Sequence, residues 1–114
     1  MDGTPKITRQ RELEAEINFL TPRLVMLGAR QIIAHGAVAR GTARKGSKIN
    51  LIVVAESELP FRERQQEFRE RLKSRERVDI IVYTPAEFSR AREESALVKA
   101  ALCEGRIVYS PERG

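Results

Sequence analysis

The sequence predicts a single domain of the α/β class, with a small mixed β-sheet and helices packed on it. Three observations lead to this class. The length of 114 residues suits one domain with one core. Short apolar segments typical of buried strands alternate with longer segments of helical periodicity. Aromatic residues make up only 5% of the chain and Trp is absent, so Leu, Ile, Val and Ala must fill the core.

The first expected element is an amphipathic helix that follows a flexible N-terminus at residues 1–8. From Arg9 onward, apolar residues recur at spacings of three and four: Leu13, Ile17, Leu20, Leu24 and Leu27. Pro22 interrupts this pattern, so either Thr21 caps a second helical piece or Pro22 kinks one long helix. Gly28 is a suitable stop for the helix.

Four apolar segments are expected to form the sheet: residues 31–35, 49–55, 78–83 and 106–109. The second is an almost continuous apolar run, which is typical of a strand covered on both faces. Between the first two strands, residues 37–41 are too short for more than one helical turn, and residues 42–47 form a polar loop. A helix separates the second and third strands, which predicts a right-handed crossover unit within a mixed sheet.

Three helices are expected in the second half of the domain. Residues 61–75 form a highly charged helix whose charges are most simply a solvated face. Thr84 and Pro85 begin the next helix, and Glu87 lies at the spacing of a capping box. Residues 95–103 form the last helix, which Gly105 ends. The domain therefore spans residues 9–110, and residues 111–114 form a C-terminal tail.

The net charge, the cysteine count and the lack of long apolar runs limit the kinds of partner and the cellular compartment to be expected. The formal net charge of +5 and the pI near 9.9 favour a polyanionic partner, nucleic acid or a phosphate-bearing ligand, and are equally compatible with solvated arginines. The single Cys103 excludes an intrachain disulfide and a zinc site, and its apolar neighbours predict a buried, inert thiol. No signal peptide and no membrane-spanning apolar run is evident, so we expect a cytoplasmic protein with no membrane association.

The most informative segment joins the first two strands. A strand leads into Gly36 and a short helix follows, an arrangement whose free backbone N–H groups suit an anion. Positive side chains then follow without any acid among them: Arg40, Arg44, Lys45 and Lys48. Taken alone this is a weak signal, because strand–Gly–helix turns are common.

The order of motifs over nearly the whole chain resembles the nucleotidyltransferase signature of the DNA polymerase beta-like superfamily. Gly36-Ala37 stands in the place of Gly-Ser, and the Ala-Arg-Gly that follows, with Arg40 at its centre, matches as it stands. Residues 47–51 stand in the place of Ser-Asp-x-Asp-Leu. Residues 78–88 match the strand that carries the third carboxylate and its following helix, and residues 104–109 match the end of such domains.

This resemblance implies the nucleotidyltransferase fold and a two-metal enzyme. In the family, three aspartates hold Mg²⁺ ions that clamp a nucleoside triphosphate, and a nucleotidyl group moves to a protein or nucleic-acid acceptor. Here Lys48 and Asn50 replace the first two aspartates, Ala37 replaces the phosphate-contacting serine, and only Asp79 is retained as a catalytic or metal-binding carboxylate. Mg²⁺ is the family's cofactor, and this residue set is a poor site for it.

The resemblance also assigns roles to individual residues. Gly36, Ala37, Arg40, Ser47, Lys48 and Asn50 occupy the nucleotide-binding and phosphate-binding positions. We hypothesise that Lys48 pairs with Asp79 across adjacent strands, with Asn50 hydrogen-bonded beside them. Lys48 then either replaces part of a metal's charge, so that nucleotide binds without catalysis, or fills a decayed site. His35 is expected to be a partly buried structural residue, with a general base as the alternative.

Three functions are compatible with these residues. The first is a catalytically impaired nucleotidyltransferase-like domain that binds a nucleotide or a small helical HEPN-type protein, as in the toxin–antitoxin-like modules that the resemblance implies. An exposed apolar patch on the last helices would support such a partner. The second is an active enzyme whose missing carboxylates come from a partner or from a second copy in a homodimer. The third is a basic nucleic-acid-binding module. The basic segment has no aromatic residues nearby on which bases could stack, and this argues against recognition of single strands. Lys48 and Asn50 fit natural decay or deliberate replacement, and Ala37 favours decay.

Overall fold

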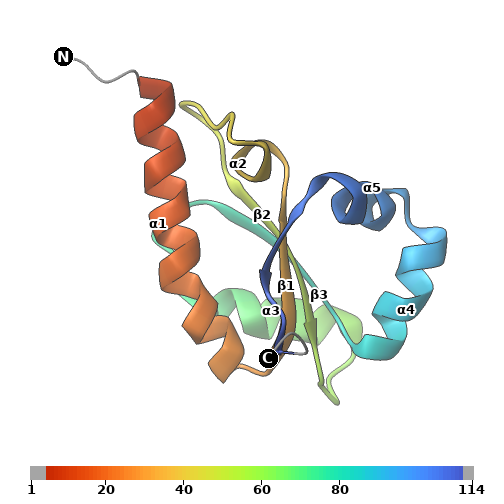
Figure 1. The fold of residues 1–114 in the computed structure, drawn as a ribbon. Helices are drawn as coiled ribbons and strands as arrows, with labels where there is room; N and C mark the ends of the chain where they lie inside the picture. The colour runs from red at the N-terminus through yellow and green to blue at the C-terminus, as the bar shows by residue number, and fades with distance from the viewer. Residues whose placement is uncertain (1–4, 112–114) are drawn as a thin grey trace.

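The computed structural model describes residues 5–111 and has the α/β architecture that the sequence predicts (Figure 1). Its elements follow the expected order: α1 (Pro5–Met26), β1 (Ala29–His35), α2 (Ala37–Arg40), β2 (Ile49–Ala55), α3 (Phe61–Leu72), β3 (Val78–Tyr83), α4 (Pro85–Glu94), α5 (Ala96–Glu104) and β4 (Arg106–Tyr109). The bounds of the last three strands agree with those predicted, because clear polar or glycine signals flank each apolar run.

Helix α1 is longer than its apolar pattern indicated. It begins at Pro5 and not at Arg9, so residues 5–8 of the expected flexible N-terminus are helical, while residues 1–4 lie outside the described part of the chain. Proline is well tolerated at a helix start. The helix also continues through Pro22 as one element, with the Thr21 hydroxyl donating to the Ile17 carbonyl oxygen at 2.7 Å. A second, separately capped helical piece is therefore excluded.

The four strands form one mixed sheet in the order β3-β2-β1-β4. Strand β1 runs antiparallel to both β2 and β4, whereas β2 and β3 are parallel and joined through α3. The mixed sheet and the crossover between the second and third strands were both expected from the sequence. Strand β1 begins two residues earlier than predicted, at Ala29.

Helices cover both faces of the sheet, as Figure 1 shows, and each face has its own apolar cluster. On one side, α1 and α3 bury Leu20, Phe68 and neighbouring residues against Leu51 and Val53. On the other, α4 and α5 pack their apolar residues against Ile52 and Val54. Strand β2 is thus buried on both faces, as its continuous apolar run predicted.

Two expectations about the helices were wrong. Cys103 is exposed and not buried, because α5 buries Val98 and Ala101 while the next two residues turn outward. The charged helix α3 ends at Leu72 and is not simply a solvated face, since Arg64 and Gln65 are buried in it. The predicted capping box of α4 is confirmed, with the Thr84 hydroxyl accepting from the Glu87 N–H.

The buried polar residues of α3 close the free edge of the sheet at β3. The Gln65 amide donates to the Val82 carbonyl oxygen and accepts from the Val82 N–H, each at 2.7 Å. Arg64 donates to the Val82 carbonyl oxygen at 2.9 Å and to both carboxylate oxygens of Glu87. Unpaired backbone groups at a sheet edge invite pairing with other chains, and Gln65 occupies those of Val82 near the end of β3. In the described part of the chain, no helix is long and apolar enough to cross a membrane.

Candidate functional site

The site begins with a row of three polar residues across three adjacent strands. The register places His35 of β1 beside Asn50 of β2, and Asn50 beside Asp79 of β3. Residues paired in this way point to the same face of a sheet. It is the face covered by α4 and α5, since Ile33 and Ile52, two positions along, belong to its apolar cluster. Sequence reasoning brought Asn50 and Asp79 together but did not place His35 in the same row.

Lys48 joins this row from the residue just before β2. Its Nζ lies 2.5 Å from Asp79 Oδ2, so the predicted ion pair is confirmed. The Lys48 side chain is 38% exposed and that of Asp79 is 63% exposed, so solvent and ligands reach both partners. The resemblance in sequence matches these two residues to two carboxylates of the family signature, and the pair holds one positive and one negative charge.

Asn50 is placed differently from the expectation. Among the described residues, its side chain makes no hydrogen bond to Lys48 or to Asp79, and its amide lies instead against Gly36. A Cβ added at Gly36 would come within 2.7 Å of Asn50 Nδ2, and Gly36 has a φ of 78°. Both facts explain why glycine stands here: the backbone is left-handed, and the approach of Asn50 leaves no room for a side chain.

Gly36 also starts the single turn of α2, whose residues line one side of a small cavity. The Arg40 N–H donates to the Gly36 carbonyl oxygen, while Ala37 is half-buried in the turn and Arg40 extends into solvent. The cavity has a volume of about 130 Å³ and lies between His35, Gly36 and Arg40 on one side and α5 on the other, where Leu97 and Glu104 line it. No signal in the sequence indicated that α5 would contribute, because its position depends on the tertiary fold.

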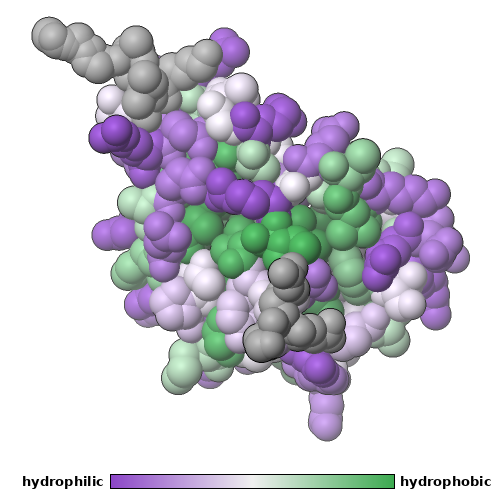
Figure 2. Space-filling model, viewed as in Figure 1, coloured by the Kyte–Doolittle hydropathy of each residue, from purple (hydrophilic) through white to green (hydrophobic). Residues whose placement is uncertain are grey.

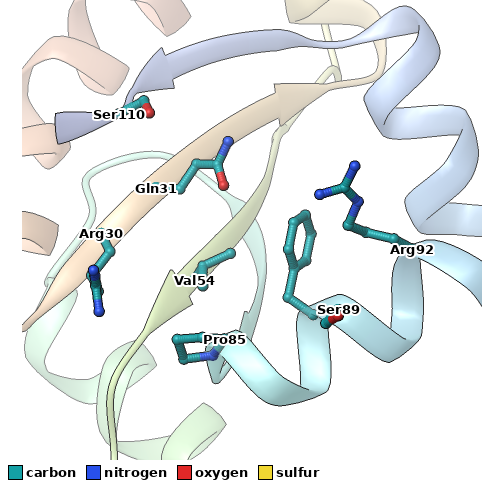
Figure 3. Close-up of a pocket in the computed structure, with 8 residues that line it drawn as sticks. Arg30, Gln31, Val54, Pro85, Ser89, Arg92 and Ser110 are labelled. Atoms are coloured by element: carbon teal, nitrogen blue, oxygen red, sulfur yellow. The ribbon is translucent and has the colours of Figure 1, made fainter. Parts of the chain in front are cut away.

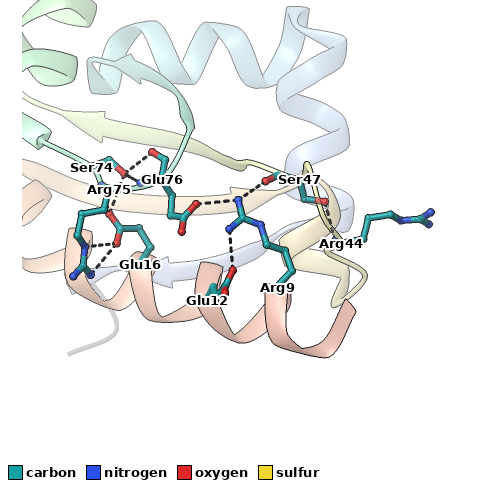
Figure 4. A network of polar contacts seen from close by, with 8 residues as sticks. All are labelled: Arg9, Glu12, Glu16, Arg44, Ser47, Ser74, Arg75 and Glu76. Carbon is teal, nitrogen blue, oxygen red and sulfur yellow. Dashed lines mark hydrogen bonds and ion pairs between the residues drawn. The ribbon is translucent and has the colours of Figure 1, made fainter. Parts of the chain in front are cut away.

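Helix α1 fixes the loop that carries the basic residues. The Arg9 guanidinium donates to the Ser47 carbonyl oxygen at 2.9 Å and pairs with Glu76, as Figure 4 shows. Gln10 donates to the Val38 carbonyl oxygen and accepts from the Ala43 N–H. These contacts were not foreseen, since polar residues on a helix are more often solvated.

Ser47 has a structural task in this loop. Its hydroxyl accepts from the Arg44 N–H at 3.0 Å, and its own N–H donates to the Arg44 carbonyl oxygen at 2.8 Å. The side chain therefore closes the turn at residues 44–47. Arg44 and Lys45 remain exposed on this turn and add positive charge near Lys48.

The pKa of His35 reflects both its burial and the charge of Asp79. Burial lowers the pKa of this imidazole below its ordinary value, and the negative charge of Asp79 opposes that shift. His35 is half-buried, as expected for a structural histidine. Near neutral pH it is therefore uncharged, and the Lys48–Asp79 pair faces a neutral neighbour.

The donor set does not fit the two Mg²⁺ ions that the resemblance implies. Mg²⁺ needs hard oxygen ligands in octahedral geometry, usually including carboxylates. Here one carboxylate is paired with an ammonium, and Asn50 offers only an amide. Within the described residues, no group of three or more His, Cys, Asp and Glu side chains could hold a metal ion. The described residues therefore support no metal-dependent step by this chain alone.

The mixed sheet, the glycine turn into α2 and the polar row on β1–β3 together define a nucleotidyltransferase-type domain. The family model for the nucleotidyltransferase domain matches residues 11–108, and the chain belongs to that family. A candidate nucleotidyltransferase from Sulfolobus solfataricus has the same fold, with a TM-score of 0.69 and 17% sequence identity over 99% of this chain and 94% of that one.

A mutant of the toxin–antitoxin complex MntA-HpeT is a more distant structural match. Its TM-score is 0.46, at 18% identity over 91% of this chain and 75% of that one. No match is found among curated proteins.

Proposed function

We propose that this domain binds the phosphate groups of a nucleoside triphosphate without a metal site of its own, and that nucleotidyl transfer by this chain alone is impaired. The observation that carries the proposal is the Lys48–Asp79 ion pair, at positions that the sequence resemblance matches to the family's metal-binding carboxylates. An ammonium at this point repels a divalent cation and attracts phosphate oxygens. Lys48 thus disfavours a bound Mg²⁺ ion and favours the triphosphate of a nucleotide.

The exposure of the pair makes it exchangeable. Exposed ion pairs contribute about 0–1 kcal/mol, so Lys48 can leave Asp79 for a phosphate oxygen at small cost. Arg40, Arg44 and Lys45 lie on the adjoining turns and are all exposed. Asp79 is the one carboxylate in the row, and a bound phosphate would sit on the Lys48 side of it.

Binding of a protein partner is a second candidate function, and a separate observation favours it. Leu97 and Leu102 of α5 and Ile107 of β4 are 44%, 39% and 55% exposed. Figure 2 shows apolar surface gathered across the middle of the side that faces the viewer, over β4 and α5. This is the exposed apolar surface on the last helices that a HEPN-type helical partner would need. Capture of such a protein should be lost in Ile107→Glu and retained in the control Met26→Glu, whose side chain is exposed on α1.

Calorimetry with ATP tests the nucleotide proposal. The chain should bind ATP without added Mg²⁺, Lys48→Met should bind it about tenfold more weakly, and the control Lys45→Met should stay within about threefold. The double variant Lys48→Asp, Asn50→Asp restores two carboxylates and should bind only with Mg²⁺. If the unaltered chain binds ATP only when Mg²⁺ is present, carboxylates from outside this site hold the metal and the proposal fails.

A further inference from the structure

A second, larger cavity lies on the same face of the sheet but at the opposite end of the strands. Its volume is about 260 Å³, and it lies between β1, α4 and the residue that follows β4 (Figure 3). Gln31 and Val54, which are paired in the β1–β2 register, mark its position. They are four residues from His35 and Asn50, or about 13 Å along the strands. The buried Ile33–Ile52 pair fills the sheet surface between the two places.

The polar lining of this cavity consists of cations and neutral hydrogen-bonding groups. Figure 3 shows the Arg92 guanidinium of α4 and the Gln31 amide of β1 reaching toward one another across the opening. Ser89 and Ser110 belong to the same lining, and none of the described carboxylates does. Among the described side chains, Arg92 has no hydrogen-bond or ion-pair partner, so its donors are free for a ligand.

Arg30 lies at the rim and already has a partner. It donates to Glu56 at 2.7 Å, and the two side chains are 52% and 69% exposed. A pair this exposed holds Arg30 only weakly. The rim therefore adds positive potential, while Arg92 and Gln31 supply the donors that face inward.

The floor of the cavity is apolar. Val54 and Phe88 line it, and each side chain is 6% exposed. Cavities that combine an apolar floor with a few convergent polar groups are the usual form of small-molecule sites. A purely ionic ligand would use the donors and leave this floor uncovered, whereas a ligand with a carbon skeleton would use both.

We propose that this cavity binds the phosphate monoester of a small molecule, such as a sugar phosphate or a nucleoside monophosphate. Charge-assisted hydrogen bonds from arginine favour phosphate oxygens. Gln31 of β1 and Ser110, which follows β4, line the cavity from elements other than the helix that carries Arg92 and Ser89, which suits the three terminal oxygens of a tetrahedral phosphate better than a flat carboxylate. The volume admits a ligand of this size with its carbon skeleton on Val54 and Phe88. The site is independent of Lys48 and of the function proposed above.

Calorimetry in the Lys48→Met background tests this proposal, because that background removes the first phosphate site. Titrations at constant ionic strength use inorganic phosphate, ribose 5-phosphate, AMP and succinate. Ribose 5-phosphate or AMP should bind about tenfold more tightly than inorganic phosphate, and succinate more weakly than either. The better of the two esters identifies the skeleton.

Two variants and a matched control localise the binding. Arg92→Gln should weaken ester binding about tenfold, and Gln31→Leu should weaken it about fivefold, since each removes a donor from the lining. Arg90→Gln makes the same change of charge on the same helix outside the cavity and should stay within about twofold. Equal losses in Arg90→Gln and Arg92→Gln would show a diffuse basic surface, and succinate binding as tightly as the esters would exclude a phosphate site. Absence of ester binding also overturns the proposal, whatever ATP does at Lys48.

Discussion

Two ion pairs near β3 differ in almost every physical respect. Arg64 is 2% exposed, donates to both oxygens of Glu87, and also donates to the carbonyl oxygens of Val82 and Leu59. Lys48 is 38% exposed and makes a single contact with Asp79. The Arg64 contact holds the pKa of Glu87 below its ordinary value, with the burial of that carboxyl opposing the shift.

The difference separates a structural ion pair from an exchangeable one. Arg64 connects α3, the end of β3 and the first turn of α4, so its loss would leave several buried groups without partners. The Lys48–Asp79 pair, by contrast, joins two charged groups that are both already accessible to water. The scaffold is thus stabilised away from the Lys48–Asp79 pair, and we expect replacement of Lys48 to leave the fold intact.

Arg64→Met should give the largest effect, because it removes one partner of a buried pair and keeps most of the apolar volume. We expect a loss of about 3 kcal/mol in the free energy of unfolding, measured by urea denaturation. The control Arg62→Met, on the exposed side of the same helix, should change it by less than about 0.5 kcal/mol. Similar losses in both variants would mean that the buried network adds nothing specific.

Gln65→Leu tests the closure of the β3 edge and should have the second largest effect. Leucine fits the buried position but leaves the Val82 N–H without its partner, which should cost about 2 kcal/mol. Gln66→Leu, one residue along on the exposed face of α3, is the matched control. If the edge matters for association as well, Gln65→Leu should form more dimer or aggregate by light scattering, and Gln66→Leu should not.

The contrast between these residues also shows what the sequence could reveal. Continuous apolar runs with polar or glycine flanks defined the strands, and matched positions in a family signature defined the Lys48–Asp79 pair. The charge pattern of residues 61–75 predicts that Arg64 lies on a solvated face, because arginine is rarely buried. Its spacing from Phe61 and Phe68 nevertheless places it at the edge of the buried face of α3, so a periodicity signal existed.

Other parts of the site depend on tertiary packing and had no local signal. The cavity beside Arg40 forms only because α5 packs over the sheet. His35 lies beside Asn50 only because of the register in which β1 pairs with β2. The same holds for the anchoring of the 41–47 loop by Arg9 and Gln10, which contact it from more than thirty residues away in the chain.

A pH titration of His35 tests the Lys48–Asp79 pair, because the negative charge of Asp79 acts on the pKa of the neighbouring imidazole. Because the folded pKa of His35 is below its ordinary value of 6.5, the unfolded state binds more protons in this range, and stability rises with pH. As the pH falls from 6.5 toward the folded pKa, this contribution is lost. NMR should find a folded pKa below 6.5 that falls further in Asp79→Asn and rises in Lys48→Met. A folded pKa above 6.5 would contradict the burial of the ring.

Lys48→Met should have the smallest effect on stability although it removes the residue on which the proposed function depends. An exposed pair contributes about 0.5 kcal/mol, so the urea midpoint should hardly move, whereas ATP binding should fall about tenfold. Lys45→Met controls for the loss of one charge from the same turn. A loss of more than about 2 kcal/mol on Lys48→Met would place this pair with Arg64–Glu87, as a structural element that phosphate could not displace at small cost. A small loss together with weakened binding would instead support a family site in which one lysine takes the place of the metal-binding carboxylates.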